Sequence, residues 1–79
     1  GLFVYPNPAQ TAFQVYFPNP ENESRHIEIT NVAGAVVFAS DSFQSADFQV
    51  SNLRLAHGTY FVQLVSAQER LAQQKIILF

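Results

Sequence analysis

The sequence predicts an all-β fold, a seven-stranded immunoglobulin-like β-sandwich, on three observations. Short apolar segments alternate with turn signals about every 8 to 12 residues. Several segments place apolar residues at every second position, the period of a half-buried strand. Helix signals are weak, because the one segment rich in helix formers, "SAQERLAQQKIILF", ends in a β-branched run and follows a strong strand. Short strands without a long helix favour two packed sheets.

Repeated Pro-Asn-Pro turns bracket the second predicted strand. "LFVY" forms the first strand, "YPNP" occupies residues 5–8, and "FPNP" returns at residues 17–20. Each proline fixes its own φ, lacks an amide donor and disfavours helix in the preceding residue, and Asn bonds to local backbone. Each motif should therefore stop a strand and turn the chain, and the second is expected to close the first hairpin. The strand over residues 11–17 alternates, and its inward face carries Thr11, Phe13, Val15 and Phe17.

The middle of the chain predicts a hairpin followed by a more polar strand. "HIEITNV", residues 26–32, alternates between the two faces, with Ile27 and Ile29 inward and Glu28 and Thr30 outward. "NVAG" then makes a tight reversal, in which Gly34 suits a left-handed backbone position. "AVVFAS" returns as the next strand. In the polar segment that follows, the core candidates are Phe48 and Val50.

The C-terminal third predicts two paired strands. "TYFVQLVS", residues 59–66, is largely apolar on both faces, which is typical of a central strand. "SAQE" then turns the chain, and Arg70 to Phe79 returns as the last strand. A short helical turn from Ala67 to Leu71 is the alternative that the local composition leaves open.

The composition describes one small folded domain and excludes several classes of function. The chain has 79 residues, of which 48% are hydrophobic and 13% charged, against roughly 25% charged in average globular proteins. Its net charge is −2, and four scattered cations cannot neutralise many phosphates, so no nucleic acid partner is expected. No apolar run reaches the roughly 18 residues of a membrane span, so no membrane insertion is expected. Without cysteine there is no thiol chemistry and no disulfide.

No arrangement of reactive residues predicts a catalytic site, a metal site or a cofactor. His26 and His57 are far apart and have no neighbouring cysteine, which argues against zinc. Ser24 and His26 could join Asp41 or Asp47 in a triad on paper, but no strained nucleophile turn such as GxSxG supports it. The acidic loops lack the DxDxDG spacing of a calcium site, and with three glycines no phosphate-binding loop can be drawn. We therefore expect no enzyme activity.

Aromatic side chains remain as candidates for a binding surface. The five that cannot all face one small core are Tyr5, Tyr16, Phe17, Phe43 and Phe61. An exposed strip of rings could stack on sugars or contact a protein. Core filling is the simpler explanation; it is preferred for Phe13, Phe38 and Phe48, and Phe61 is left open. The alternative function is thus a carbohydrate-binding or adhesive β-sandwich module of a surface enzyme.

Four motifs in order resemble the type A C-terminal sorting domain of the type IX (Por) secretion system of Bacteroidetes. "VYPNPAQTAFQVYF" opens the chain, and "IEITNVAGAVV" follows with an Asn and a Gly in a central hairpin. "LRLAHGTYFVQLVS" carries the pattern L-x-x-G-x-Y, and "KIILF" ends the chain. The resemblance covers essentially the whole chain, and the order of the motifs makes it more specific than "YPNP" alone.

The resemblance implies a fold, a function and partners. Its fold is a seven-stranded sandwich, and residues 1–79 would form a single sorting domain at the end of a larger secreted cargo protein. The cargo would cross the periplasm and be presented to the outer-membrane translocon. A sortase-like cysteine protease would then remove the domain by cleaving the linker before it, during cell-surface attachment or release. The domain itself would catalyse nothing and bind no cofactor.

The resemblance also assigns roles to residues. Translocon recognition is implied for Gly58, Tyr60, Lys75, Ile76, Ile77, Leu78 and Phe79. The motif at the start of the domain is Tyr5, Pro6, Asn7 and Pro8, and the structural turn is Asn31 and Gly34. A terminal strand at a sheet edge offers unpaired backbone groups, so we expect recognition by strand addition. The same edges leave dimer formation through edge strands open, and "KIILF" can also be a buried strand.

Overall fold

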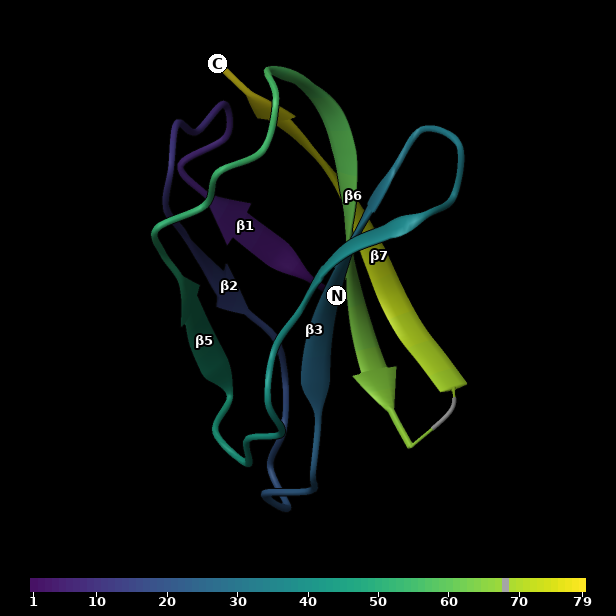
Figure 1. Ribbon diagram of the computed structural model, residues 1–79. Helices are drawn as coiled ribbons and strands as arrows, with labels where there is room; N and C mark the ends of the chain where they lie inside the picture. The colour runs from purple at the N-terminus through teal and green to yellow at the C-terminus, as the bar shows by residue number, and fades with distance from the viewer. Residues whose placement is uncertain (68) are drawn as a thin grey trace.

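The computed structural model describes residues 1–67 and 69–79, and in these residues the chain forms seven β-strands and no helix (Figure 1). The strands are β1 (Phe3–Tyr5), β2 (Phe13–Tyr16), β3 (His26–Asn31), β4 (Val36–Ala39), β5 (Asp47–Val50), β6 (Gly58–Ser66) and β7 (Glu69–Leu78). The all-β prediction is confirmed. The helical alternative is wrong from Glu69 to Leu71, which belong to β7; Gln68, within the predicted turn, lies outside the described residues.

The strands form two antiparallel sheets. One has the order β1-β2-β5 and the other the order β4-β3-β6-β7. Figure 1 shows the two sheets as layers, with β1, β2 and β5 on one side and β3, β6 and β7 on the other. The chain therefore folds as a two-layer sandwich, in which consecutive strands often belong to opposite sheets.

The core lies between the sheets and follows the alternation read from the sequence. From the first sheet come Val4, Phe13, Val15 and Val50, and from the second Ile27, Ile29, Val62, Leu64, Ile76 and Leu78. Strand β6 lies between β3 and β7 and buries side chains on both of its faces, since Val62 faces the core while Gln63 and Val65 are also buried. The prediction of a central strand is confirmed.

Two of the threonines differ in burial from what the alternation predicted. Thr11 precedes β2 and is exposed, so the prediction that it faces inward is wrong. Thr30 is 3% exposed, although it was expected to point to solvent. It lies beside Phe61 of the central strand, and Gln63 Nε2 donates to its hydroxyl at 3.4 Å. Side chains on the adjacent strands thus cover an outward-facing position, which local alternation does not reveal.

The second Pro-Asn-Pro motif carries the chain from one sheet to the other. Strands β2 and β3 belong to different sheets, so the prediction that this motif closes the first hairpin is wrong. That hairpin joins β1 to β2 and turns at the first motif. Asn19 is buried, and its side-chain amide donates to the carbonyls of Glu23, Gln44 and Ser45 at 2.9, 3.2 and 3.1 Å. These bonds hold the crossover against the segment before β5.

Candidate functional site

The last strand, β7, combines core burial with a place at the edge of its sheet. It pairs antiparallel with β6, and β6 is its neighbour in the sheet order β4-β3-β6-β7. Ile76 and Leu78 are buried in the core, whereas Lys75 and Phe79 are exposed. The segment "KIILF" is therefore a core strand. Two of its side chains point into the core, and those that alternate with them lie on the outer face of the sheet.

The side chain of Asn7 covers part of this edge. Asn7 Nδ2 donates to the carbonyl of Lys75 at 2.8 Å, and the amide of Ile77 donates to Asn7 Oδ1 at 3.1 Å. A side-chain amide carries the same donor and acceptor as a peptide group. Asn7 thus occupies the place of a neighbouring strand's backbone, with nearly the whole chain length between it and its partners.

Ala9 continues the same contact with its own backbone. The amide of Ala9 donates to the carbonyl of Ile77, and the amide of Phe79 donates to the carbonyl of Ala9, both at 2.9 Å. Ala9 is 1% exposed and forms a parallel bridge with Leu78. We call residues 7–9, which act as a short parallel strand on β7, the latch. The Tyr5–Pro6 and Asn7–Pro8 peptide bonds are cis.

The latch changes what the sequence predicted for the terminal strand. An edge strand was expected to offer unpaired backbone groups, and from Lys75 to Phe79 this expectation is wrong, because Asn7 and Ala9 bond to that edge. A proline on either side of Asn7 restricts the chain and removes competing donors, which leaves the asparagine amide to meet β7. The opening motif and the end of the chain thus form one structural unit.

Gly58 and Tyr60 lie beside the same part of β7. Gly58 pairs with Leu78, and Tyr60 pairs with Ile76. Tyr60 is buried, and its hydroxyl donates to the carbonyl of Ala56 at 2.6 Å. Gly58 has φ 150°, a backbone conformation that favours glycine. The structure thus brings together the two groups of residues to which the resemblance assigned recognition.

Comparison with known families decides the assignment. The model of the secretion system C-terminal sorting domain matches residues 3–78. The chain belongs to the family of type IX C-terminal sorting domains. Comparison with curated proteins finds no match.

Family membership states what this sorting domain does in outline. It is a C-terminal signal for type IX secretion, which implies an interaction with the secretion system and export of the cargo to the cell surface or the medium. This supports the sorting function over the carbohydrate-binding alternative. The family is a secretion-signal family and not an enzymatic one.

Asn31 and Gly34 lie away from the latch, in the turn between β3 and β4. Asn31 Oδ1 accepts the amides of Ala33 and Ala35, each at 3.0 Å. Gly34 has φ 87° and donates its amide to the carbonyl of Asn31 at 3.0 Å. Strand β4 is at the opposite end of the sheet from β7, so this pair shapes a turn and does not contribute to the latched edge.

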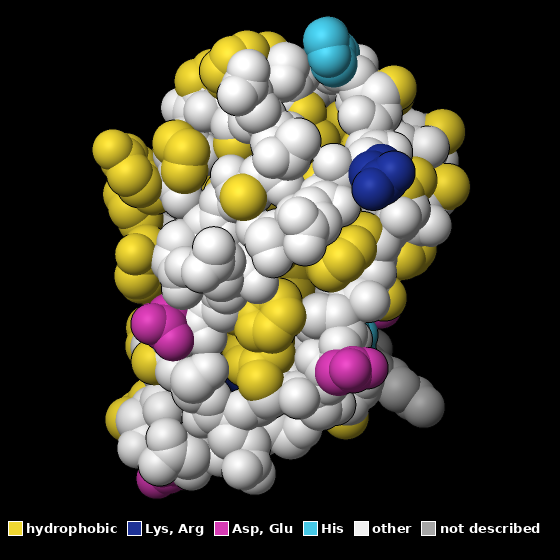
Figure 2. Space-filling view, turned by 60° about the vertical axis from the view of Figure 1, so that its left-hand side comes forward, with side chains coloured by type: hydrophobic (Ala, Val, Ile, Leu, Met, Phe, Trp, Pro, Cys, Tyr) yellow, Lys and Arg dark blue, Asp and Glu magenta, His cyan; other side chains and the backbone are white. Residues whose placement is uncertain are grey.

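Three exposed aromatic rings of the sorting domain gather on β1 and β2. Phe3, Tyr5 and Tyr16 are 61%, 64% and 44% exposed, and the rings of Phe3 and Tyr16 lie 6.2 Å apart. Phe17 is buried, and Phe43 stacks on Phe48 at 4.6 Å against the core. Figure 2 shows hydrophobic side chains exposed at several places across the visible face, among few basic side chains. The expected strip of rings is thus smaller than the sequence allowed.

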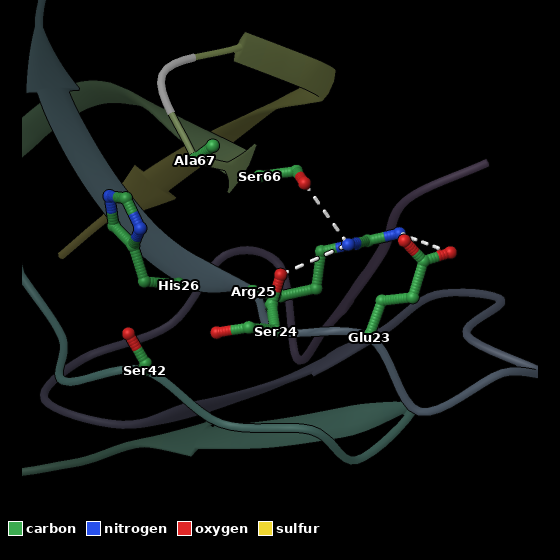
Figure 3. Close-up of a pocket in the computed structure, with 7 residues that line it drawn as sticks. All are labelled: Glu23, Ser24, Arg25, His26, Ser42, Ser66 and Ala67. Atoms are coloured by element: carbon green, nitrogen blue, oxygen red, sulfur yellow. Dashed lines mark hydrogen bonds and ion pairs between the residues drawn. The ribbon is translucent and has the colours of Figure 1, made fainter.

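A hollow of about 450 Å³ lies where β3 begins and β6 ends (Figure 3). Arg25 Nη1 donates to the carbonyl of Ser24 at 3.0 Å and to Ser66 Oγ at 3.1 Å. The ring of His26 points away from Arg25 and meets Glu28 at 3.0 Å, so Ser24 and His26 form no catalytic triad. Among the described residues no group of three or more His, Cys, Asp or Glu could hold a metal ion, and no helix there is long and apolar enough to cross a membrane.

Proposed function

We propose that the outer-membrane translocon reads this sorting domain through the last strand, with Gly58 and Tyr60 supporting its end. The observation that carries the proposal is the arrangement around β7. The opening motif, the Gly58–Tyr60 segment and "KIILF" are separate in sequence, and their residues meet along one strand. A partner that contacts this region would meet the family's characteristic motifs together.

We propose that residues 1–79 are a single domain at the end of a larger cargo protein that passes through the periplasm. A sortase-like cysteine protease would cleave the linker before the domain, and the cargo would then be attached to the surface or released. Two domains that paired would do so through β4, which is an edge strand with exposed Val36 and Val37. A charged residue introduced in place of a β4 valine would remove such a dimer.

We further propose that the sandwich is immunoglobulin-like. The tyrosine corner of immunoglobulin domains is a tyrosine near the start of the sixth strand, whose hydroxyl bonds to backbone a few residues upstream. Tyr60 of β6 bonds in this manner to Ala56. The arrangement differs from the constant-type domain in one strand, because β4 pairs with β3 and not with β5.

The recognition proposal is tested with point changes that leave the core intact. The chain is fused behind a periplasm-directed fluorescent protein in a type IX-competent bacterium, and reporter is counted in the medium and on the cell surface. Lys75→Glu reverses an exposed charge within "KIILF", and Arg70→Glu makes the same change near the other end of β7. We expect Lys75→Glu to lower export and Arg70→Glu to leave it unchanged.

A chain lacking residues 75–79 serves as the negative reference, since it loses the buried Ile76 and Leu78. Circular dichroism of the purified variants establishes that each point variant is folded. Equal export of Lys75→Glu, Arg70→Glu and the unchanged chain would argue that the exposed side of β7 is not read. Export of the chain without residues 75–79 would show that these residues are not needed for the signal.

A further inference from the structure

We propose that the edge of β7 from Lys75 to Phe79 is a docking surface for an extended segment of a partner protein, and that the latch occupies this surface until the partner displaces it. The partner segment would run parallel to β7, in the place now taken by Asn7 and Ala9. This inference rests on the proposed recognition of the last strand and specifies how that strand is read.

The first argument is that this edge already accepts a strand. Ala9 and Leu78 form a parallel bridge, with backbone bonds from Ala9 to Ile77 and from Phe79 to Ala9. The geometry of strand addition is therefore present in the molecule, and its occupant belongs to the same chain. Any partner that pairs with the backbone of "KIILF" at this edge must compete with residues 7–9.

The second argument is that the latch is an incomplete strand. Pro6 and Pro8 have no amide hydrogen, so within residues 6–9 the donors are the side chain of Asn7 and the amides of Asn7 and Ala9. Asn7 and Pro8 are exposed, and Ala9 is the buried residue of the latch. A partner segment without proline could replace the side-chain amide by a peptide group and continue along β7 past Lys75. It would form more bonds than the latch does.

The side chains beside the latched edge indicate the partner's chemistry. Lys75 is exposed, Ile77 is half-buried, and Phe79 is 56% exposed. Side chains of paired strands interact with their neighbours on the same face, and opposite charges stabilise such pairs. The surface therefore fits an extended segment with an acidic residue beside Lys75 and an apolar residue near Phe79.

A reversible covalent lock tests the displacement directly. Ala9→Cys and Leu78→Cys introduce the chain's first cysteines at residues that are bridge partners. Adjacent strands lie about 4.8 Å apart, within the range of Cα separations that disulfides span. The double variant is fused to the reporter and expressed in type IX-competent cells with and without their periplasmic thiol oxidase. The two single-cysteine variants serve as matched controls.

We expect the oxidised double variant to fall to the export of the chain lacking residues 75–79, and the reduced double variant to match the single variants. Equal export of the oxidised and reduced forms would overturn the inference, because the latch would then not have to open. The proposed function would fail separately, by unchanged export of Lys75→Glu. A locked domain that is exported while Lys75→Glu is not would leave recognition of β7 standing without displacement.

Opening the latch gives the complementary test. Asn7→Ala should speed amide exchange at Ile77 about tenfold or more, since an ordinary hydrogen bond is lost, while the domain stays folded. Asn19→Ala, in the other Pro-Asn-Pro motif, should leave exchange at Ile77 unchanged, because Asn19 bonds to other segments. Export of Asn7→Ala should equal or exceed that of the unchanged chain.

Loss of export by a folded Asn7→Ala domain would overturn the inference, because the closed latch would then be part of what is read.

Sedimentation velocity on the same variant separates a partner protein from a second copy of the chain. A monomer supports a partner protein. An Asn7→Ala dimer that Lys75→Glu dissolves would overturn that assignment in favour of a second copy.

Discussion

At the scale of single residues, two asparagines in the same tripeptide do the same work in different places. Asn7 supplies a donor and an acceptor to the edge of β7. Asn19 donates to three carbonyls and accepts the amide of Glu23 at 3.1 Å. In both cases the side-chain amide bonds to backbone groups as a peptide group would. The partners of Asn7 are distant in sequence, and those of Asn19 include both distant residues and the nearby Glu23. The repeat thus has a common chemical use and two structural outcomes.

Asn19→Ala should destabilise the domain by about 2 kcal/mol, since three carbonyls in part-buried hydrogen bonds lose their donor. Urea unfolding followed by circular dichroism measures the loss. Gln44→Ala, at an exposed position whose backbone carbonyl is one of those acceptors, is the control and should cost under about 0.5 kcal/mol. A similar cost for both changes would contradict a specific role for the Asn19 amide.

Gly58→Ala should cost about 1 to 3 kcal/mol through the backbone alone. An added Cβ at this position meets nothing within 4 Å, but φ is 150°, which side chains other than glycine rarely adopt. The free energy of unfolding in urea gives the cost. Replacement of Gly1, where an added Cβ also meets nothing, should have no measurable effect. An unchanged free energy of unfolding for Gly58→Ala would mean that β6 can start with another backbone angle.

At the scale of elements, β7 shows how one strand serves two purposes. Its inward residues complete the core, and Ile76 is 0% exposed. Its edge receives the latch, and its outward residue Lys75 remains in solvent. Stability and the proposed recognition would therefore depend on different residues of the same short segment, so truncation alone cannot separate them.

Ile76→Ala should lower the free energy of unfolding by about 3 kcal/mol, the range for a large aliphatic residue cut to alanine in a packed core. Lys75→Ala should change it by less than about 0.5 kcal/mol, as expected for an exposed residue. Parallel urea titrations of the two variants make the comparison. A large loss for Lys75→Ala would show that its side chain supports the fold, and it could then not report on recognition alone.

At the scale of the whole molecule, the latch ties the start of the chain to its end. The core draws on both sheets, and the chain has no cysteine to cross-link them. Residues 7–9 follow a strand of the first sheet and bond to a strand of the second. The contact therefore joins the two layers at one side of the sandwich. Each sheet buries its apolar face only against the other sheet, so neither is expected to be stable alone.

The domain should consequently unfold in one cooperative transition, with coincident midpoints for far-ultraviolet circular dichroism and tyrosine fluorescence. The fluorescence reports on Tyr5, Tyr16 and Tyr60, which belong to both sheets. An earlier change in fluorescence than in circular dichroism would indicate that one sheet loosens first. Asn7→Ala should keep a single transition, because it removes bonds at the edge and none from the core.

The sequence by itself determined the strands and the family. Alternation is a local property, so Ile27 and Ile29 could be placed inside before any neighbour was known, and β6 could be identified as central from its two apolar faces. The ordered motifs carry the family assignment in the same way. Hydrogen-bond partners are not local, however, and an asparagine between prolines can bond to any peptide group within reach.

Only the tertiary structure decided where the two Pro-Asn-Pro motifs bond and which outward positions are covered. Asn7 meets Ile77 and Asn19 meets Gln44 because the strands between them pack into two layers. Thr30 is buried because side chains of the next strand lie over it. Each outcome depends on groups brought together by the packing of the whole sandwich, and no local pattern encodes that proximity.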